Sequence, residues 1–295
     1  MLPRNIVTGS REFHLIPSFI EYGVGSALYS TYIHQSGGEV STKYSRYTEI
    51  VQRVGNALAE NSPRKGMNFE FTVVKDWSIN AWCLPGGKIA INLGLLDAME
   101  KESSDFGLGT ITFEEKVAAV LSHEITHATA RHFGRAMELR IFLASLIKAS
   151  NFVINYFIDK RYDQQIKKVE STEIDEKFTK DQRTTQIEDL KLEKQNRIDK
   201  ISQIFNFFAR LSVSGLGKCN SRSHELEAAK YGMHLMQKSN INPESALWLQ
   251  HFFMQQKTQL GGGFFEWLSH LTSTHPSSSE RLKANSVTLQ QLNGK

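Results

Sequence analysis

Residues 119–132 read AVLSHEITHATARH and place His123 and His127 four positions apart, with Glu124 next to the first histidine. Residues four apart on an α-helix lie on the same face, one turn from each other, so both imidazoles can reach one ion. Glu124 lies about 100° around the helix from His123, close enough to reach a water on that ion. The pattern therefore predicts two zinc ligands and a general base. A chain of this length contains the pattern by chance in roughly one case in a hundred, so an ordinary amphipathic helix is the alternative.

A zinc ion in a hydrolase takes three protein ligands and keeps one position for water, so a third ligand is needed. His132 lies five residues beyond His127, off the ligand face, and is interpreted as a core histidine or one that supports a ligand. The helical stretch SRSHELEAAKYGMHLM, residues 221–236, offers Glu225 and Glu227. The spacing alone leaves both glutamates open as the third ligand.

The chain of 295 residues is long enough for one large domain or two smaller ones, and its hydrophobic content of 40% is typical of a globular protein. The formal net charge of +4 is too small to indicate a nucleic-acid surface, so no nucleic-acid partner is predicted. Cys83 and Cys219 can pair at most once, which leaves the redox compartment open. The N-terminal stretch has no charged start followed by a continuous apolar run, so no secretory signal is expected in the chain as it stands.

The order of helix and strand signals divides the chain. Residues 1–42 are predicted to form an N-terminal arm with a helical centre, and apolar residues at helical spacing predict a helix from Lys43 to Glu60. The β-branched and aromatic run 69–74 predicts one strand. The stretch 88–92, which follows a turn at 85–87, predicts a second strand. Together the two strands indicate a small antiparallel sheet.

The longest apolar stretch, residues 141–158, is interrupted by Lys148 and by four polar residues. A membrane span needs about 20 mostly apolar residues, so a buried helix is the favoured interpretation. Contact with a membrane surface through 141–158 is the alternative. Residues 159–203 are dense in charge of both signs and contain neither Gly nor Pro. They indicate a solvated helical hairpin or a partly disordered insertion, with a coiled-coil partner surface as the alternative.

Four segments together resemble the zinc metallopeptidase family of HtpX and the CAAX prenyl endopeptidases, family forty-eight of the metallopeptidases. They are NAWCLPGGKIAINLGLL at 80–96, VLSHEITHATARH at 120–132, SRSHELEAAKYG at 221–232 and TSTHPSSSERL at 272–282. The chain is most similar to the branch that holds the mitochondrial overlapping-activity protease and the periplasmic β-barrel-assembly-enhancing protease. The resemblance covers most of residues 7–285 apart from the charged insertion.

The resemblance implies an α+β, predominantly helical fold of the zincin-like (gluzincin) type with a small antiparallel sheet. The metalloprotease domain would span 43–290, with the charged helical insertion at about 159–203. It also implies one Zn²⁺ per chain. The metal ligands would be His123, His127 and Glu225, and the catalytic base would be Glu124. Glu124 would deprotonate the attacking water and pass the proton to the leaving amine.

Further positions follow from the same resemblance. Arg222 matches a family arginine near the site, with a structural salt bridge as the alternative, and Glu227 is interpreted as structural. The family usually has Asp where this chain has Ala229, and losing a carboxylate behind a ligand commonly weakens metal binding or activity about 10–100-fold. His275 matches a histidine that can occupy the open zinc position in the β-barrel-assembly-enhancing relative; the alternative is a histidine that only caps the fold. The strand at 88–92 is either a sheet edge that an extended substrate joins or a core strand.

The predicted function is a zinc-dependent endopeptidase that degrades misfolded or unassembled proteins at or near a membrane. The endopeptidase activity rests on the residues and the resemblance together, whereas the quality-control role rests on the resemblance alone. One alternative is a weakly active zinc-binding chaperone or adaptor that docks through its charged insertion, which Ala229 favours. A second is a helical structural protein without metal. The resemblance implies the bacterial envelope or periplasm, or the mitochondrial inner membrane, and does not choose between them.

Overall fold

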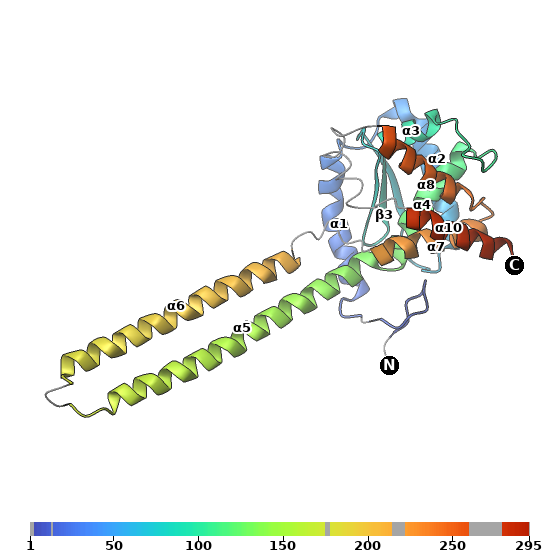
Figure 1. Cartoon of the computed structure of the whole chain (residues 1–295). Helices are drawn as coiled ribbons and strands as arrows, with labels where there is room; N and C mark the ends of the chain where they lie inside the picture. The colour runs from blue at the N-terminus through green and yellow to red at the C-terminus, as the bar shows by residue number, and fades with distance from the viewer. Residues whose placement is uncertain (1–2, 13, 175–177, 214–221, 260–278, 295) are drawn as a thin grey trace. The chain divides into compact units, whose positions relative to one another are not determined.

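The structure is a computed structural model, and Figure 1 shows its course. The described residues are 3–12, 14–174, 178–213, 222–259 and 279–294. The chain divides into two compact units, of which the first combines Met1–Ala136 with Lys218–Lys295 and the second is Met137–Gly217. The second unit therefore includes both the apolar stretch at 141–158 and the charged insertion predicted at about 159–203.

The first unit is mostly helical and contains one small sheet (Figure 1). The helical centre predicted in the N-terminal arm is confirmed as α1, and the helix predicted next is confirmed as α2, which buries the apolar face formed by Ile50, Val51, Val54 and Leu58. The elements in chain order are α1 Ser18–Gln35, the 3₁₀ turn η1 Thr42–Tyr44, α2 Ser45–Asn61, β1 Glu70–Val74, β2 Ala81–Leu84, β3 Lys88–Asn92, α3 Leu93–Lys101, α4 Phe113–Thr129, α7 Arg222–Lys238, α8 Ser245–Gln259 and α10 Ser279–Asn293.

The sheet has three strands in the order β1-β3-β2. Both predicted strands are confirmed, as β1 and β3, and they pair parallel, with Glu70 opposite Lys88. The short strand β2 forms a hairpin with β3 and runs antiparallel to it, with Ala81 opposite Ile91. The sheet is therefore mixed and not purely antiparallel as predicted. The antiparallel pair is β2 with β3, whereas the two predicted strands, β1 and β3, are parallel. Since β3 lies between two strands, the interpretation of residues 88–92 as a sheet edge is wrong.

Helix α4 forms the centre of the first unit and is buried on all sides from Lys116 to Thr129. A capping box starts it, in which the Thr112 side chain accepts from the Glu115 N–H and the Glu115 carboxylate accepts from the Thr112 N–H. Helices α2, α7 and α8 pack around α4, and β2 also contacts it. At Gly232 of α7, an added Cβ would meet the His123 backbone nitrogen at 3.3 Å. The glycine thus allows α7 to approach α4 closely.

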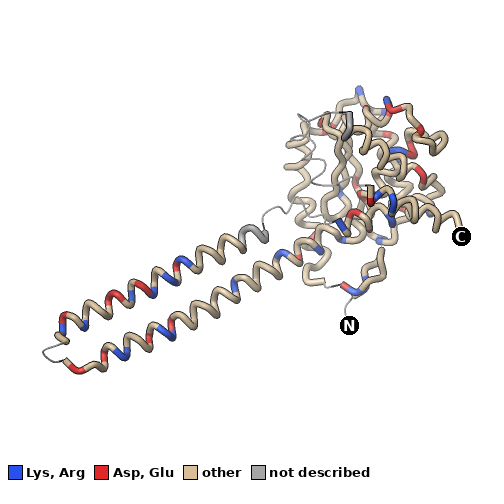
Figure 2. The backbone as a smooth tube through the Cα atoms, in the orientation of Figure 1, with Lys and Arg blue, Asp and Glu red and all other residues tan. Residues whose placement is uncertain are grey.

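Helices α5 (His132–Glu170) and α6 (Lys180–Val213) run side by side in opposite directions as a helical hairpin (Figure 1). The first residues of α5, up to Ala136, belong to the first unit, and the rest of the hairpin forms the second unit. Asn155 Nδ2 donates to Ser202 Oγ at 3.1 Å, and Tyr162 Oη donates to the Glu193 carboxylate at 2.7 Å. Lys, Arg, Asp and Glu residues are concentrated towards the loop end of both helices (Figure 2). A helical hairpin is one of the two forms that the charged composition of 159–203 indicates.

The apolar stretch at 141–158 lies on α5, and its interpretation as a buried helix was wrong. Phe152 is 74% exposed and Phe157 is 62% exposed. Among the helices that the structure describes, α5 is the one that is long and apolar enough to cross a membrane. No residue in its most apolar window is buried. Hydropathy reports how apolar a stretch is, whereas burial depends on which other elements pack against it. Although α6 lies along one side of α5, none of the described elements buries a residue of this window.

Candidate metal centre

Three buried side chains on α4 and α7 converge on one point. The Nε2 atoms of His123 and His127 lie 3.0 Å apart. The Glu225 carboxylate, in the first turn of α7, places Oε2 3.2 Å from His123 Nε2 and Oε1 3.3 Å from His127 Nε2. Each of the three residues is at most 8% exposed. The structure thus brings together all three ligands expected from the resemblance.

The spacing of these atoms fits a zinc ion. Zinc bonds of about 2.0–2.2 Å in a tetrahedral arrangement hold neighbouring ligand atoms about 3.3 Å apart. The three separations of 3.0, 3.2 and 3.3 Å are close to that value. Two imidazoles and one carboxylate are also a donor set that suits zinc rather than calcium or magnesium, which prefer oxygen ligands. The residues present are therefore compatible with the metal that the sequence predicts.

Glu124 lies beside this point and borders a cavity of about 30 Å³. A cavity needs roughly 10–15 Å³ of such space to hold a water molecule, so this one has room for water. His123 and Arg281 also line the cavity, together with Asn80, Ala81, Leu95, Val120, Leu249 and Phe253. Glu124 and His123 thus border one space that can hold a water molecule, as a general base beside a metal-activated water requires.

Arg281, on α10, is a site residue that the sequence interpretation missed. It is buried, and its Nη1 lies 3.3 Å from Glu225 Oε2. Burial lowers the pKa of Arg281, while the charges of Glu225 and Glu124 act in the opposite direction. The only signal in the sequence was its place in the segment 272–282 that carries the family resemblance.

A second group of side chains adjoins His127 on the side away from the ligand cluster. His132 Nδ1 lies 2.7 Å from His127 Nδ1, and its Nε2 lies 3.0 Å from Glu227 Oε1. Arg135 Nη1 donates to the same Glu227 oxygen at 2.9 Å. His132 is fully buried, which lowers its pKa to about 4. The interpretation of His132 as a histidine that supports a ligand agrees with these contacts.

Glu227 is more closely connected to the site than the sequence interpretation had it. Burial raises its pKa, but the hydrogen bond and charge of His132, together with Arg135, outweigh that effect and hold the pKa below its ordinary value. The carboxyl group is therefore ionised at neutral pH. Sequence position did not reveal this link, because His132 and Glu227 are 95 residues apart.

The remaining predicted positions are not part of the cluster. Arg222 is exposed and forms an ion pair with Glu280, which matches the salt-bridge alternative. Ala229 is buried on α7, one turn after Glu225, and its methyl group offers no hydrogen bond. His275 lies outside the described residues.

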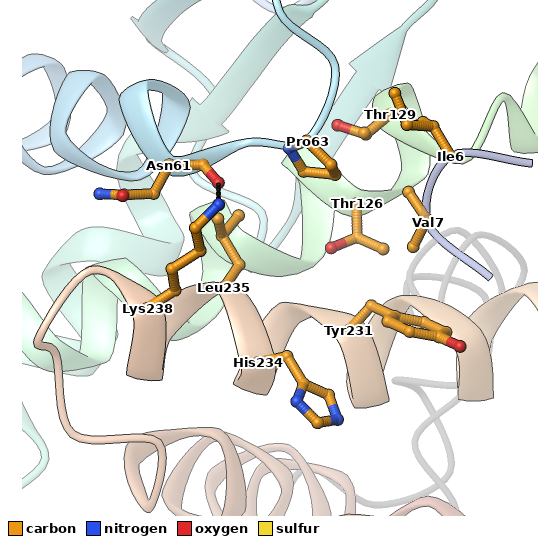
Figure 3. A pocket seen from close by; sticks show the side chains of 10 residues that line it. All are labelled: Ile6, Val7, Asn61, Pro63, Thr126, Thr129, Tyr231, His234, Leu235 and Lys238. Carbon is orange, nitrogen blue, oxygen red and sulfur yellow. Dashed lines mark hydrogen bonds between the residues drawn. The ribbon is translucent and has the colours of Figure 1, made fainter. Parts of the chain in front are cut away.

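A larger cavity of about 190 Å³ lies on another side of α4 (Figure 3). Thr126 and Thr129 border it from α4, and Tyr231 and His234 border it from α7. Lys238, at its rim, donates from Nζ to the Asn61 carbonyl oxygen at 3.0 Å. None of the three ligands lines this cavity, so it is separate from the metal centre.

A ligand helix packed near a small mixed sheet, with the third ligand on a later helix, defines a zincin-like metalloprotease fold. The sequence model of peptidase family M48 matches residues 45–287. The chain therefore belongs to peptidase family M48, a family of metalloproteases, as the sequence motifs predicted.

Individual relatives agree with this assignment. The mitochondrial metalloendopeptidase OMA1 of Schizosaccharomyces pombe is 27% identical over 161 residues, which are 51% of this chain and 44% of the relative. The β-barrel assembly-enhancing protease of Yersinia pestis is 33% identical over 99 residues, 34% of this chain and 18% of the relative. The mitochondrial metalloendopeptidase OMA1 of Arabidopsis thaliana is 33% identical over 90 residues, 30% of this chain and 16% of the relative. The matches thus span less than half the length of each of these relatives.

Proposed function

We propose that the chain is a zinc-dependent endopeptidase in which His123, His127 and Glu225 hold one zinc ion and Glu124 acts as the general base. The observation that carries this proposal is the spacing of the three ligand atoms, 3.0–3.3 Å apart in a buried cluster. Membership of peptidase family M48 supports the same activity. The second alternative, a structural protein without metal, gives no reason for two imidazoles and a carboxylate to converge.

Glu124 and Arg281 are the groups proposed to carry the proton transfer and the charge. When bound, zinc supplies a Lewis acid that polarises the scissile carbonyl and lowers the pKa of water. Glu124 takes the proton from the attacking water and delivers it to the leaving amine. Arg281 borders the same cavity and adds a fixed positive charge close to the carboxylate of Glu225. A buried guanidinium of this kind favours negative charge that develops on the substrate oxygen.

Unfolded or extended polypeptides are the proposed substrates. Asn80 and Ala81, at the start of β2, line the cavity with His123 and Glu124. β2 is at one end of the strand order, so a peptide lying along it would pass the catalytic groups in an extended conformation. Degradation of misfolded or unassembled proteins is proposed by analogy with relatives named mitochondrial metalloendopeptidase and β-barrel assembly-enhancing protease.

The exposed apolar zone of α5 is proposed to contact a lipid bilayer. Phe142, Phe152 and Phe157 each expose more than half of their surface. Exposed apolar zones on a protein surface commonly mark a site of contact with a membrane or a partner. The zone is continued on α6 by Phe207 and Phe208, which are also exposed. Asn151 and Asn155 donate hydrogen bonds to Ser202 across the hairpin, and hydrogen bonds between polar side chains of neighbouring helices are typical of helices that pack together in lipid.

The activity is tested on the full chain by measuring its zinc content and its cleavage of an unfolded protein such as reduced, carboxymethylated lactalbumin. Wild type is expected to hold one zinc per chain and to cleave internally, whereas Glu124→Gln keeps the zinc and loses cleavage by a factor of about 10⁴ or more. Glu114→Gln is the matched control, because Glu114 lies on the same helix in an exposed ion pair with Arg53. It is expected to cleave like wild type.

Two results contradict the proposal in different ways. A chain that binds zinc, yet cleaves no better than Glu124→Gln, is the weakly active chaperone or adaptor, and suppression of aggregation by both proteins would then support that alternative. A chain that binds no zinc, and whose thermal stability is unchanged by a chelator, is the structural protein without metal.

A further inference from the structure

We propose that His132 and Glu227 position the His127 imidazole for metal binding, as a hydrogen-bonded relay on the far side of that ligand. The proposal rests on the metal centre of the proposed function and adds two positioning residues to it. Ala229, one turn beyond Glu225 on α7, presents only a methyl group and cannot take this part. An imidazole ligand needs such a partner, because its second nitrogen sets both the ring orientation and the proton position.

The distances define one consistent arrangement of protons. His127 turns Nε2 towards the other ligands, at 3.0 Å from His123 and 3.3 Å from Glu225. As a metal ligand, Nε2 carries no proton, so the proton lies on Nδ1 and is donated to His132 Nδ1, 2.7 Å away. His132 then carries its own proton on Nε2 and donates it to Glu227, 3.0 Å away. Metal binding at His127 Nε2 thus decides which atom donates and which accepts in each hydrogen bond of the series.

The far end of the relay is held in place by charge and packing. Arg135 donates from Nη1 to Glu227 at 2.9 Å, and its Nε lies 3.2 Å from Glu12 Oε1. The His132 ring is fully buried and stacks on the ring of His224, with centroids 4.4 Å apart and an angle of 2° between the planes. His132 therefore cannot rotate without losing two hydrogen bonds and this stack. A fixed relay of this kind keeps the His127 ring in a single orientation.

The backbone between α4 and α5 explains why His132 faces back towards the ligand. Arg131 adopts a left-handed conformation with φ 58° between Ala130, the C-cap of α4, and His132, the first residue of α5, so the two helices are not continuous. Its side chain is buried, with Nε donating to Glu21 at 2.8 Å and Nη2 donating to the Ile16 carbonyl at the same distance. These bonds offset the cost of a left-handed non-glycine residue. The turn is thus built into the fold independently of the metal.

The relay is tested by zinc affinity, measured by competition with a chromophoric chelator on the full-length chain. Glu227→Gln keeps the size of the side chain and removes its charge, and His132→Asn interrupts the series at its centre. Each variant is expected to bind zinc about 10–100-fold more weakly than wild type. The double variant is expected to bind about as weakly as the weaker single variant, because both changes break the same series.

Matched controls separate this effect from a general loss of histidine or glutamate. His251→Asn changes a histidine whose ring stacks on that of Phe106, and Glu244→Gln changes the glutamate just before α8. Both are expected to keep wild-type zinc affinity within about twofold. Circular dichroism of the metal-free forms reports whether each variant is folded.

A second measurement uses wild type and so does not depend on a variant that folds. In zinc-loaded protein with ¹⁵N-labelled histidines, a scalar coupling between His127 Nδ1 and His132 Nδ1 is expected across the N–H···N hydrogen bond. No coupling between these two nitrogens, or zinc affinity within twofold of wild type for folded Glu227→Gln, overturns the relay. If wild type and Glu227→Gln bind zinc with equal affinity and both cleave the substrate, the relay is contradicted and the proposed function stands. If wild type binds no zinc, the proposed function fails with it.

Discussion

At the scale of single residues, a substitution of Arg281 tests the catalytic chemistry of the metal centre while it leaves all three proposed ligands in place. Arg281→Gln removes a buried positive charge that lies 3.3 Å from Glu225 Oε2. We expect kcat/KM for a peptide substrate to fall by about 10²–10³, because charge stabilisation in the transition state is lost. Zinc content should remain one per chain, since none of the proposed ligands changes. Steady-state kinetics and metal analysis on the same preparation check both parts.

Arg53→Gln serves as the control for this prediction. Arg53, on α2, forms an exposed ion pair with Glu114 of α4. It should leave kcat/KM within about twofold of wild type. Equal losses in the two variants would mean that Arg281 has no special part in the reaction.

The two histidines of the metal centre were predictable from the sequence, because their spacing of four is a property of one helix. The third ligand needed the family resemblance, because spacing alone did not distinguish Glu225 from Glu227. Arg281 and the contact between His132 and Glu227 were not predictable from local pattern. They join residues far apart in the chain, and only the tertiary packing that brings the start of α5 and the helix α10 against α7 places them together.

At the scale of elements, α1 offers two glycines in different surroundings. Gly23 is exposed, with nothing within 4 Å of an added Cβ, whereas a Cβ on Gly25 would lie 1.8 Å from the Pro85 carbonyl oxygen. Gly23→Ala should stabilise the protein by up to about 1 kcal/mol, because alanine has the higher helix propensity. Gly25→Ala should destabilise it by about 1–3 kcal/mol, because α1 must move away from the β2-β3 turn.

Thermal or urea unfolding of the two variants beside wild type checks this contrast. Since both changes are the same and lie on one helix, propensity cancels and packing alone accounts for the difference. Equal stability of the two variants would show that α1 does not rest against the turn at Pro85 in solution.

The elements themselves were predicted well where their signals were local. The strands at 69–74 and 88–92 are present, but their parallel pairing was not predictable, because pairing depends on the path of the intervening chain. The exposed state of α5 was not predictable either. A buried helix and a lipid-facing helix can have the same composition. The two are separated here by the structure, in which no residue of the most apolar window is buried by the described elements.

At the scale of the whole molecule, binding of the metal should be visible in the stability of the protein. Removing zinc with a chelator at neutral pH should lower the melting temperature by about 8–16 °C when zinc is present at about 1,000 times its dissociation constant. Added zinc should restore it. The same treatment of His123→Ala should change the melting temperature little, and a large shift in that variant would place the stabilising metal elsewhere.

The membrane proposal is also tested on the whole chain. Flotation with vesicles of phosphatidylcholine and phosphatidylglycerol should recover wild type with the lipid. Phe152→Ser combined with Phe157→Ser removes two of the most exposed apolar side chains of α5, and should reduce recovery at least tenfold. Leu192→Ser, which changes an exposed apolar residue in the charged part of α6, should float like wild type. Wild type that stays with the soluble fraction, or a double serine variant that floats equally well, contradicts lipid contact through α5.

The division of the ligands between α4 and α7 has a consequence for the newly made chain. His123 and Glu225 are 102 residues apart, and the hairpin of α5 and α6 is encoded between them. At synthesis rates of about 5–20 residues per second, roughly 5–20 s separate the first ligand from the last. A nascent chain therefore has an incomplete ligand set until the entire hairpin has been translated. Translation that stops within the hairpin yields a product that contains His123, Glu124 and His127 but lacks Glu225, and therefore lacks the full set of proposed metal ligands.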